Sequence, residues 1–90
     1  MAMRNAKANG VGIKPINAVE YYRGVLLDGR GDLLNYIPTE IAMSLSFDRR
    51  CAEAMSNHPN IAIRGTYAEA RGHLSRLDDK KRAEFAALLR

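Results

Sequence analysis

Apolar residues recur at three- and four-residue steps through most of the chain, which is the spacing of one face of an α-helix. Between residues 15 and 29 this pattern predicts a first helix, with Asn17 as its N-cap and Glu20 completing a capping box. Gly29 suits the position just after the end of that helix. The triplet Arg30-Gly31-Asp32 then predicts a turn, because glycine and aspartate favour turn geometry.

A second apolar stripe begins after Pro38 and ends at Asn57-His58-Pro59-Asn60, where proline cannot continue a helix. Two interpretations of this stretch are open. Residues 38–57 form either one continuous helix or two short helices joined by a tight turn at Ser46. In the second case Phe47 buries into the corner between the helices, and Asp48 caps the second helix.

The last third of the chain also allows alternatives. Residues 61–64 form a short apolar run that could be a strand. Thr66 and Glu69 predict a capping box that opens a helix running toward residue 90. Ser75 and Asp78 form a further possible capping box, so residues 66–90 are either one helix or two helices with a break near Leu77.

These elements predict an all-α fold, a compact bundle of three to five helices with at most one short strand pair. Residues 1–14 lack periodicity and acidic side chains, so we expect a flexible basic arm before a single helical domain at 15–90. Five residues on the apolar stripes are expected to be mostly buried: Leu26, Leu45, Met55, Leu74 and Phe85.

Charge suggests what kind of partner this 90-residue domain could bind. The net charge is +4, from 14 basic and 10 acidic side chains. The first and last thirds of the chain each carry a net +3, while the middle third carries −2. A basic excess of this size suits a polyanion partner, although an ordinary solvated surface explains it equally well.

The residues with catalytic or metal-binding chemistry are few and scattered. A single cysteine allows no disulfide within the chain and favours a reducing compartment. Cys51, His58 and His73 have no metal-ligand spacing, so we expect a buried cysteine and two surface histidines. The sequence therefore predicts no enzyme, cofactor or metal site. Because no segment has the apolar length of a membrane span, we expect a cytoplasmic protein.

The middle of the chain carries a resemblance. Glu40-Ile41-Ala42 matches an acidic-aliphatic-alanine start, and Asn57-His58-Pro59-Asn60 is similar to a stretch that follows a recognition helix. From Glu40 to Ile61 the chain resembles the helix-turn-helix headpiece of lactose-repressor-type DNA-binding regulators, with Ser46 where that family usually has a turn glycine. The resemblance implies a segment that reads duplex DNA.

The predicted function is that of a small DNA-binding regulatory protein. Arg49, Arg50 and Asn57 would face the groove, because arginine reads guanine and asparagine reads adenine. Three basic residues of the arm would contact phosphate: Arg4, Lys7 and Lys14. The alternative is a small helical adaptor or inhibitor, of the kind that phages and mobile elements encode, docking on a larger host protein. In either case a homodimer through residues 66–90 is expected.

Overall fold

The computed structural model describes the backbone of residues 15–29 and 31–89, and the side chains from residue 18 onward with the same gap. Within this part of the chain there are five α-helices, one short 3₁₀ helix and no strand, which confirms the all-α prediction. In chain order the elements are α2 (Pro15–Leu27), η1 (Gly31–Leu33), α3 (Thr39–Leu45), α4 (Arg49–Ser56), α5 (Ile61–Ser75) and α6 (Asp79–Ala87). The predicted arm lies outside the described residues.

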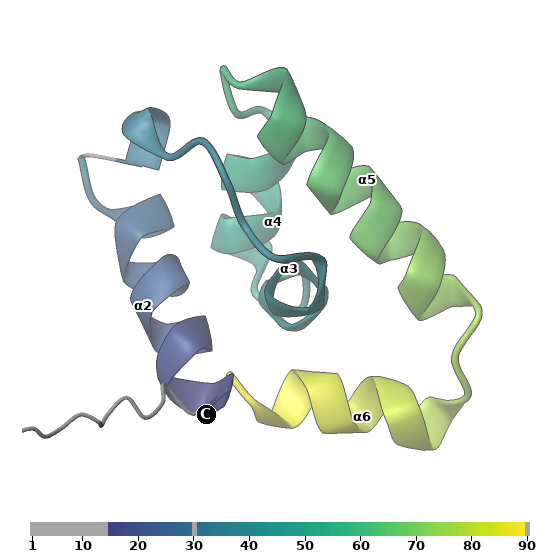
Figure 1. Ribbon diagram of the computed structural model, residues 1–90. Coiled ribbons are helices and arrows are strands. Elements are labelled where there is room, and N and C mark those ends of the chain that lie inside the picture. Colours follow the sequence, from purple (N-terminus) through teal and green to yellow (C-terminus); the bar gives the residue numbers. More distant parts are fainter. Residues whose placement is uncertain (1–14, 30, 90) are drawn as a thin grey trace, which may run out of the picture.

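The shortest α-helix, α3, lies at the centre of the bundle. It packs against α2, α5 and α6, and Figure 1 shows it enclosed between these elements. Four consecutive residues, 42–45, are buried, so α3 has no solvent-exposed face near its C-terminal end. A helix segment that is covered on several sides needs apolar residues on all of its faces. Three of the four buried residues of α3 are apolar, and Ser44 is the buried residue with a hydroxyl.

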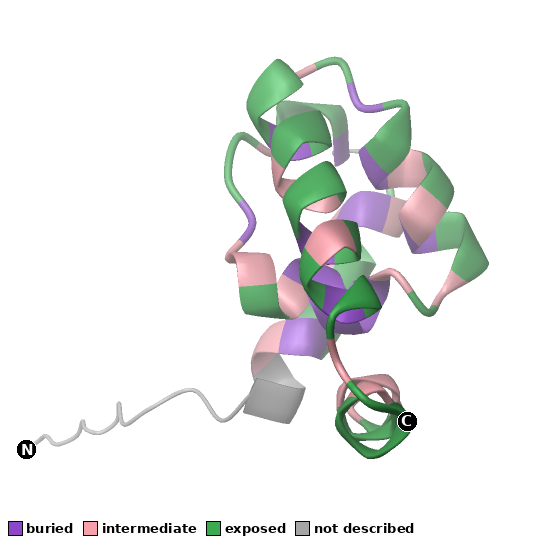
Figure 2. Ribbon diagram, turned by 90° about the vertical axis from the view of Figure 1, so that its right-hand side faces the viewer, coloured by how far each residue is buried: buried purple, intermediate pink, exposed green. Residues whose placement is uncertain are grey.

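The predicted core residues are buried with one exception. Leu26, Leu45, Met55 and Leu74 are all at most 6% exposed. Phe85 is partly buried and packs against this core, so it is mostly covered but less completely than the other four. The reason is the position of α6, which covers α3 from the outside of the bundle and has no buried residue of its own (Figure 2).

Helix α5 begins earlier than the sequence pattern predicted. Its N-cap is Asn60, whose side-chain oxygen accepts a hydrogen bond from the Ala62 amide at 2.8 Å. Residues 61–64 are therefore helical, not extended. The capping box predicted at Thr66 and Glu69 is wrong, because Thr66 lies inside α5 and its hydroxyl donates to the Ala62 carbonyl at 3.0 Å.

The open choice in the C-terminal segment is settled in favour of two helices. α5 ends at Ser75, and the side chain of Asp78 caps α6 by accepting from the Lys81 amide at 2.9 Å. The guanidinium of Arg82 donates to the Leu74 carbonyl at 3.1 Å. The Leu74 carbonyl also accepts from the Leu77 amide at 3.1 Å, so Arg82 adds a side-chain donor to the end of α5.

The N-terminal helix also differs from its prediction, because α2 begins at Pro15 and Asn17 lies inside it rather than at its cap. After α2 the chain turns back tightly at Gly31. A Cβ atom at this position would lie 2.8 Å from the Leu26 carbonyl oxygen and 3.0 Å from that of Val25. Only glycine fits so close to the backbone of another segment without a shift of that backbone.

No helix in the described part of the chain is both long and apolar enough to cross a membrane.

Candidate nucleic-acid interface

The turn between α3 and α4 settles the open choice at residues 38–57: the structure contains two helices, not one. Ser46 closes α3 with its amide donating to the Ala42 carbonyl at 2.9 Å, and the amides of the next two residues also point back to α3. Asp48 then adopts an extended backbone, and its Oδ1 accepts from the amides of Arg50 at 2.9 Å and Cys51 at 3.2 Å. Asp48 is the predicted N-cap, and its geometry begins a new helix in a new direction.

The aromatic residue of this turn is not where the sequence placed it. Phe47 is 43% exposed, so the prediction that it buries into the corner between the two helices is wrong. The residues of α3 and α4 nearest the turn that face the core are Leu45 and Cys51, and both are completely buried. Phe47 stands beside the start of α4 with its ring partly in solvent.

Asp48 also forms an ion pair with a residue of α2. The Nε of Arg23, on α2, donates to the second carboxylate oxygen of Asp48 at 2.8 Å. Partial burial by itself raises the pKa of Asp48, but the hydrogen bonds from the Cys51 amide, Arg23 and the Arg50 amide together outweigh it, so the pKa lies below its ordinary value. Asp48 is thus a carboxylate at neutral pH, and it links α2 to α4.

The outer face of α4 is polar and exposed along its whole length. Arg49, Arg50, Glu53, Ser56 and Asn57 are all exposed, and their three- and four-residue spacings place them on one side of the helix. Arg49 and Glu53 form a loose ion pair at 3.8 Å, with side chains 91% and 66% exposed. The three predicted groove-facing residues therefore share one surface, while Arg4, Lys7 and Lys14 lie outside the described residues.

The inner face of α4 is part of the core. Cys51 and Met55 have no exposed surface, as the pattern predicted for Cys51. Burial and then the negative charge of Asp48 raise the pKa of the Cys51 thiol to about 11. A thiol with such a pKa and no access to solvent is unreactive, so Cys51 is a packing residue. In the described part of the chain, no three His, Cys, Asp or Glu side chains come together in a way that could hold a metal ion.

The connection from α4 to α5 is organised around His58. The prediction of a surface histidine is wrong here, because His58 is only 3% exposed. Its Nδ1 accepts from the Asn60 amide at 3.0 Å, so its Nε2 carries the proton and donates to the Gly31 carbonyl at 2.8 Å. The Arg64 guanidinium donates to the His58 carbonyl from the first turn of α5. His58 thereby fixes the end of α4 against the loop that follows α2.

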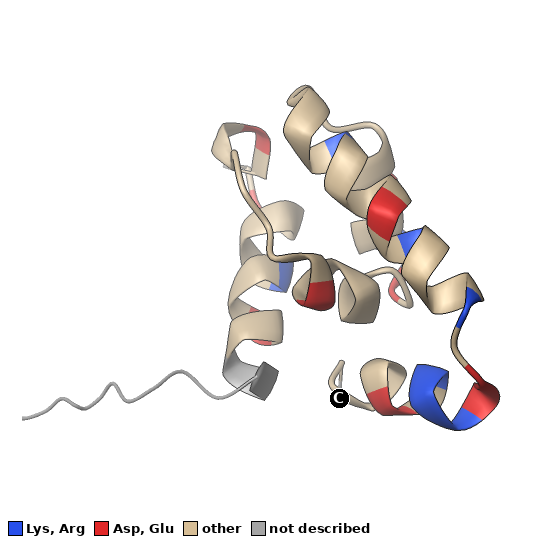
Figure 3. Ribbon diagram, turned by 45° about the vertical axis from the view of Figure 1, so that its right-hand side comes forward, with Lys and Arg blue, Asp and Glu red and all other residues tan. Residues whose placement is uncertain are grey.

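Two arginines near the turn were not predicted from the sequence. Figure 3 shows that Lys and Arg residues occur on α2, α5 and α6, the elements that surround the α3–α4 pair. Arg23 of α2 contacts the Asp48 cap, and Arg71 of α5 lines a hollow together with the turn residues Ser46 and Phe47. Neither residue belongs to a motif, and only the packing of helices brings them beside α4.

No protein-family model, curated protein or solved structure matches this chain. The interpretation of the site therefore rests on its own geometry.

Proposed function

We propose that this protein is a small regulatory protein that binds duplex DNA, with α4 lying in the major groove. The observation that carries the proposal is the capped break at Asp48, which turns α4 away from α3 and leaves its outer face exposed. A helix-turn-helix presents the second of its helices in this way, with residues near the helix start contacting base edges.

The side chains of this face suit base recognition. Arg50 has no carboxylate within ion-pair distance among the described residues, so its guanidinium is available to donate hydrogen bonds to two acceptors of guanine. The ion pair of Arg49 with Glu53 is long and solvent-exposed, and such pairs contribute little free energy. Asn57, at the other end of α4, could read adenine, and the predicted phosphate contacts of Arg4, Lys7 and Lys14 would add affinity without sequence preference.

The test is duplex binding measured by fluorescence anisotropy over a series of salt concentrations. We expect wild-type affinity to fall steeply with added salt, because phosphate contacts release counterions. Arg50→Ala should weaken binding. Arg76 is exposed at the C-cap of α5, and Arg76→Ala should weaken binding less. Equal effects of the two substitutions, or binding that salt does not change, would rule out α4 as the DNA-reading element.

A second candidate function, docking on a larger protein, is favoured by a different observation. Three of the most exposed apolar side chains lie close together in the chain, with Tyr21 64%, Leu33 80% and Tyr36 63% exposed. Tyr21 and Leu33 also line one hollow of about 370 Å³ with Val25 and Leu34. Apolar surface of this kind occurs at protein–protein contacts.

This second function is tested by a pull-down from nuclease-treated cell extract. The wild type, Arg50→Ala and Leu33→Ser serve as the three baits. A docking protein should be retained by the wild type and by Arg50→Ala, and lost with Leu33→Ser. Retention by Leu33→Ser would show that this apolar surface is not where the partner binds.

The homodimer through residues 66–90 stays a prediction. Four large apolar side chains of this segment are only partly covered by the described part of the chain: Leu77, Phe85, Leu88 and Leu89. A two-fold dimer would present two copies of α4 to half-sites separated by about 34 Å, one turn of the duplex.

A further inference from the structure

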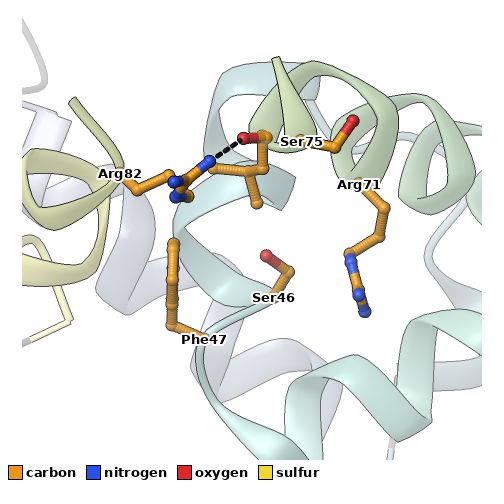
Figure 4. Close-up of a pocket in the computed structure, with 6 residues that line it drawn as sticks. Ser46, Phe47, Arg71, Ser75 and Arg82 are labelled. Atoms are coloured by element: carbon orange, nitrogen blue, oxygen red, sulfur yellow. Dashed lines mark hydrogen bonds between the residues drawn. The ribbon is translucent and has the colours of Figure 1, made fainter. Parts of the chain in front are cut away.

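A hollow of about 330 Å³ lies directly beside the turn that begins α4. Ser46 and Phe47 line it from the turn, Arg71, Leu74 and Ser75 from α5, and Arg82 from α6. Figure 4 shows these side chains around the hollow, with the two guanidinium groups on opposite sides of it. Because Asp48 and Arg49 follow Phe47 in the chain, the hollow adjoins the N-terminal end of the proposed DNA-reading helix.

The two arginines of the hollow differ in what they already bind. Arg82 donates to the carbonyls of Leu74 and Leu77, and its other terminal nitrogen pairs with the Asp79 carboxylate at 2.6 Å. Its charge is therefore compensated, and its donors close the end of α5. The dashed line at Arg82 in Figure 4 marks its hydrogen bond to the Leu74 carbonyl.

Arg71 has no such compensation. Its Nη1 donates to the Tyr67 hydroxyl at 3.0 Å, and its guanidinium carbon lies 5.9 Å from the centre of the Tyr67 ring. Both contacts are to a neutral side chain, and among the described residues no carboxylate lies within ion-pair distance of Arg71. Figure 4 shows the Arg71 side chain extending from α5 toward the turn at Ser46.

The remaining polar groups of the hollow are already used as donors. The Ser46 hydroxyl donates to the Met43 carbonyl at 2.7 Å, and the Ser75 hydroxyl donates to the Gly72 carbonyl at 2.7 Å. Arg71 is thus the lining side chain that combines an uncompensated positive charge with unused N–H groups. Its planar fork of donors matches the oxygens of a phosphate group.

We propose that Arg71 binds a backbone phosphate of the duplex whose groove holds α4. This inference rests on the proposed function, because it is α4 that would bring a DNA strand to the hollow. A helix in the major groove lies between two phosphate backbones, so a cation beside its N-terminal end meets one of them. The contact positions the protein on the duplex and carries no information about base sequence.

The experiment compares wild type, Arg71→Ala, Arg71→Lys and Arg76→Ala for binding to a random duplex as salt is varied. Loss of one phosphate contact should reduce the slope of log affinity against log salt by about 0.9, and weaken binding by about eightfold near 0.1 M salt. Arg71→Lys keeps the charge and should keep a slope near that of the wild type. Arg76→Ala removes the same charge from the C-cap of α5, which does not line the hollow, and should change the slope less than Arg71→Ala.

The outcomes separate this inference from the proposed function. A wild type with salt-dependent binding, together with an Arg71→Ala slope equal to that of Arg76→Ala, overturns the phosphate contact and leaves the DNA-binding proposal standing. A wild type without salt-dependent duplex binding overturns both. Thermal unfolding of each variant shows that a changed slope does not come from loss of the fold, because Arg71 is exposed and its substitution should leave the midpoint nearly unchanged.

Discussion

Arg23 and Asp48 lie 25 residues apart in the chain, and the Arg23 Nε donates to the Asp48 Oδ2 at 2.8 Å. The other oxygen of the same carboxylate accepts from the amides of Arg50 and Cys51. One side chain therefore begins α4 and joins it to α2. The direction of the proposed DNA-reading face depends on this carboxylate.

Replacing Asp48 by alanine should lower the free energy of unfolding by about 1–2 kcal/mol, because the variant loses the N-cap of α4. Asp48→Asn should cost less, since asparagine is also a good cap and only the charged pair with Arg23 is weakened. Urea denaturation of the three proteins measures both differences. Equal stabilities of the alanine variant and the wild type would contradict the capping role.

The same residue predicts a dependence of stability on pH. Because the pKa of Asp48 is lower in the folded protein than its ordinary 3.8, its carboxylate stabilises the fold fully above that ordinary value. This contribution is lost as pH falls through the lower, folded-state pKa. The stability difference between wild type and Asp48→Asn should hence be constant near neutral pH and shrink below about pH 4. A difference that grew on acidification would contradict the lowered pKa.

Two glycines give opposite predictions for the same substitution. Gly31→Ala should destabilise the protein, because its Cβ would lie 2.8 Å from the Leu26 carbonyl oxygen. Gly24→Ala should stabilise it by about 0.5–1 kcal/mol, since Gly24 lies inside α2 with no atom near its would-be Cβ. The midpoints of thermal unfolding should move in opposite directions. Shifts of the same sign would disprove the close approach at Gly31.

Adjacent residues of α3 provide a similar contrast. Ser44 is completely buried, and its hydroxyl has no hydrogen-bond partner among the residues that the structure describes. Ser44→Ala should leave stability unchanged or raise it by about 1 kcal/mol, because it removes an unsatisfied polar group. Leu45→Ala should lower stability by about 2–5 kcal/mol through the cavity it creates. Chemical denaturation of both variants checks the order, and a Ser44→Ala variant as unstable as Leu45→Ala would mean that the Ser44 hydroxyl has a partner.

Local signals allowed part of the fold to be predicted from the sequence. A capping aspartate acts on amides two and three residues ahead, so Asp48 and Asp78 are recognisable from neighbouring residues alone. The caps made a break of the chain at these two points one of the two open alternatives. The burial of Leu45 and Met55 could be predicted from the helical spacing of the apolar residues. The same local patterns also mislead, since Thr66 and Glu69 have capping-box spacing but lie inside α5.

Contacts between distant segments could not be predicted. His58 can be buried because its Nε2–H group donates a hydrogen bond to the Gly31 carbonyl, which lies 27 residues away in the chain. Arg23 reaches Asp48, and Arg71 reaches the turn, only because α2 and α5 pack on either side of the α3–α4 pair. Phe47 is 43% exposed, although the local pattern assigned it to the corner between α3 and α4. None of these relationships leaves a periodicity or a spacing in the sequence.

The most direct test of the DNA-reading role of α4 is the sequence preference of Arg50→Ala. Duplexes selected by the wild type from a random library supply the preferred sequence, and an unselected duplex is the reference. We predict that Arg50→Ala loses about 1–3 kcal/mol of discrimination between the two, because one bidentate contact to a base is removed. Arg71→Ala should weaken binding to both duplexes by the same factor. An Arg50→Ala variant that discriminates as well as the wild type would show that α4 does not read DNA.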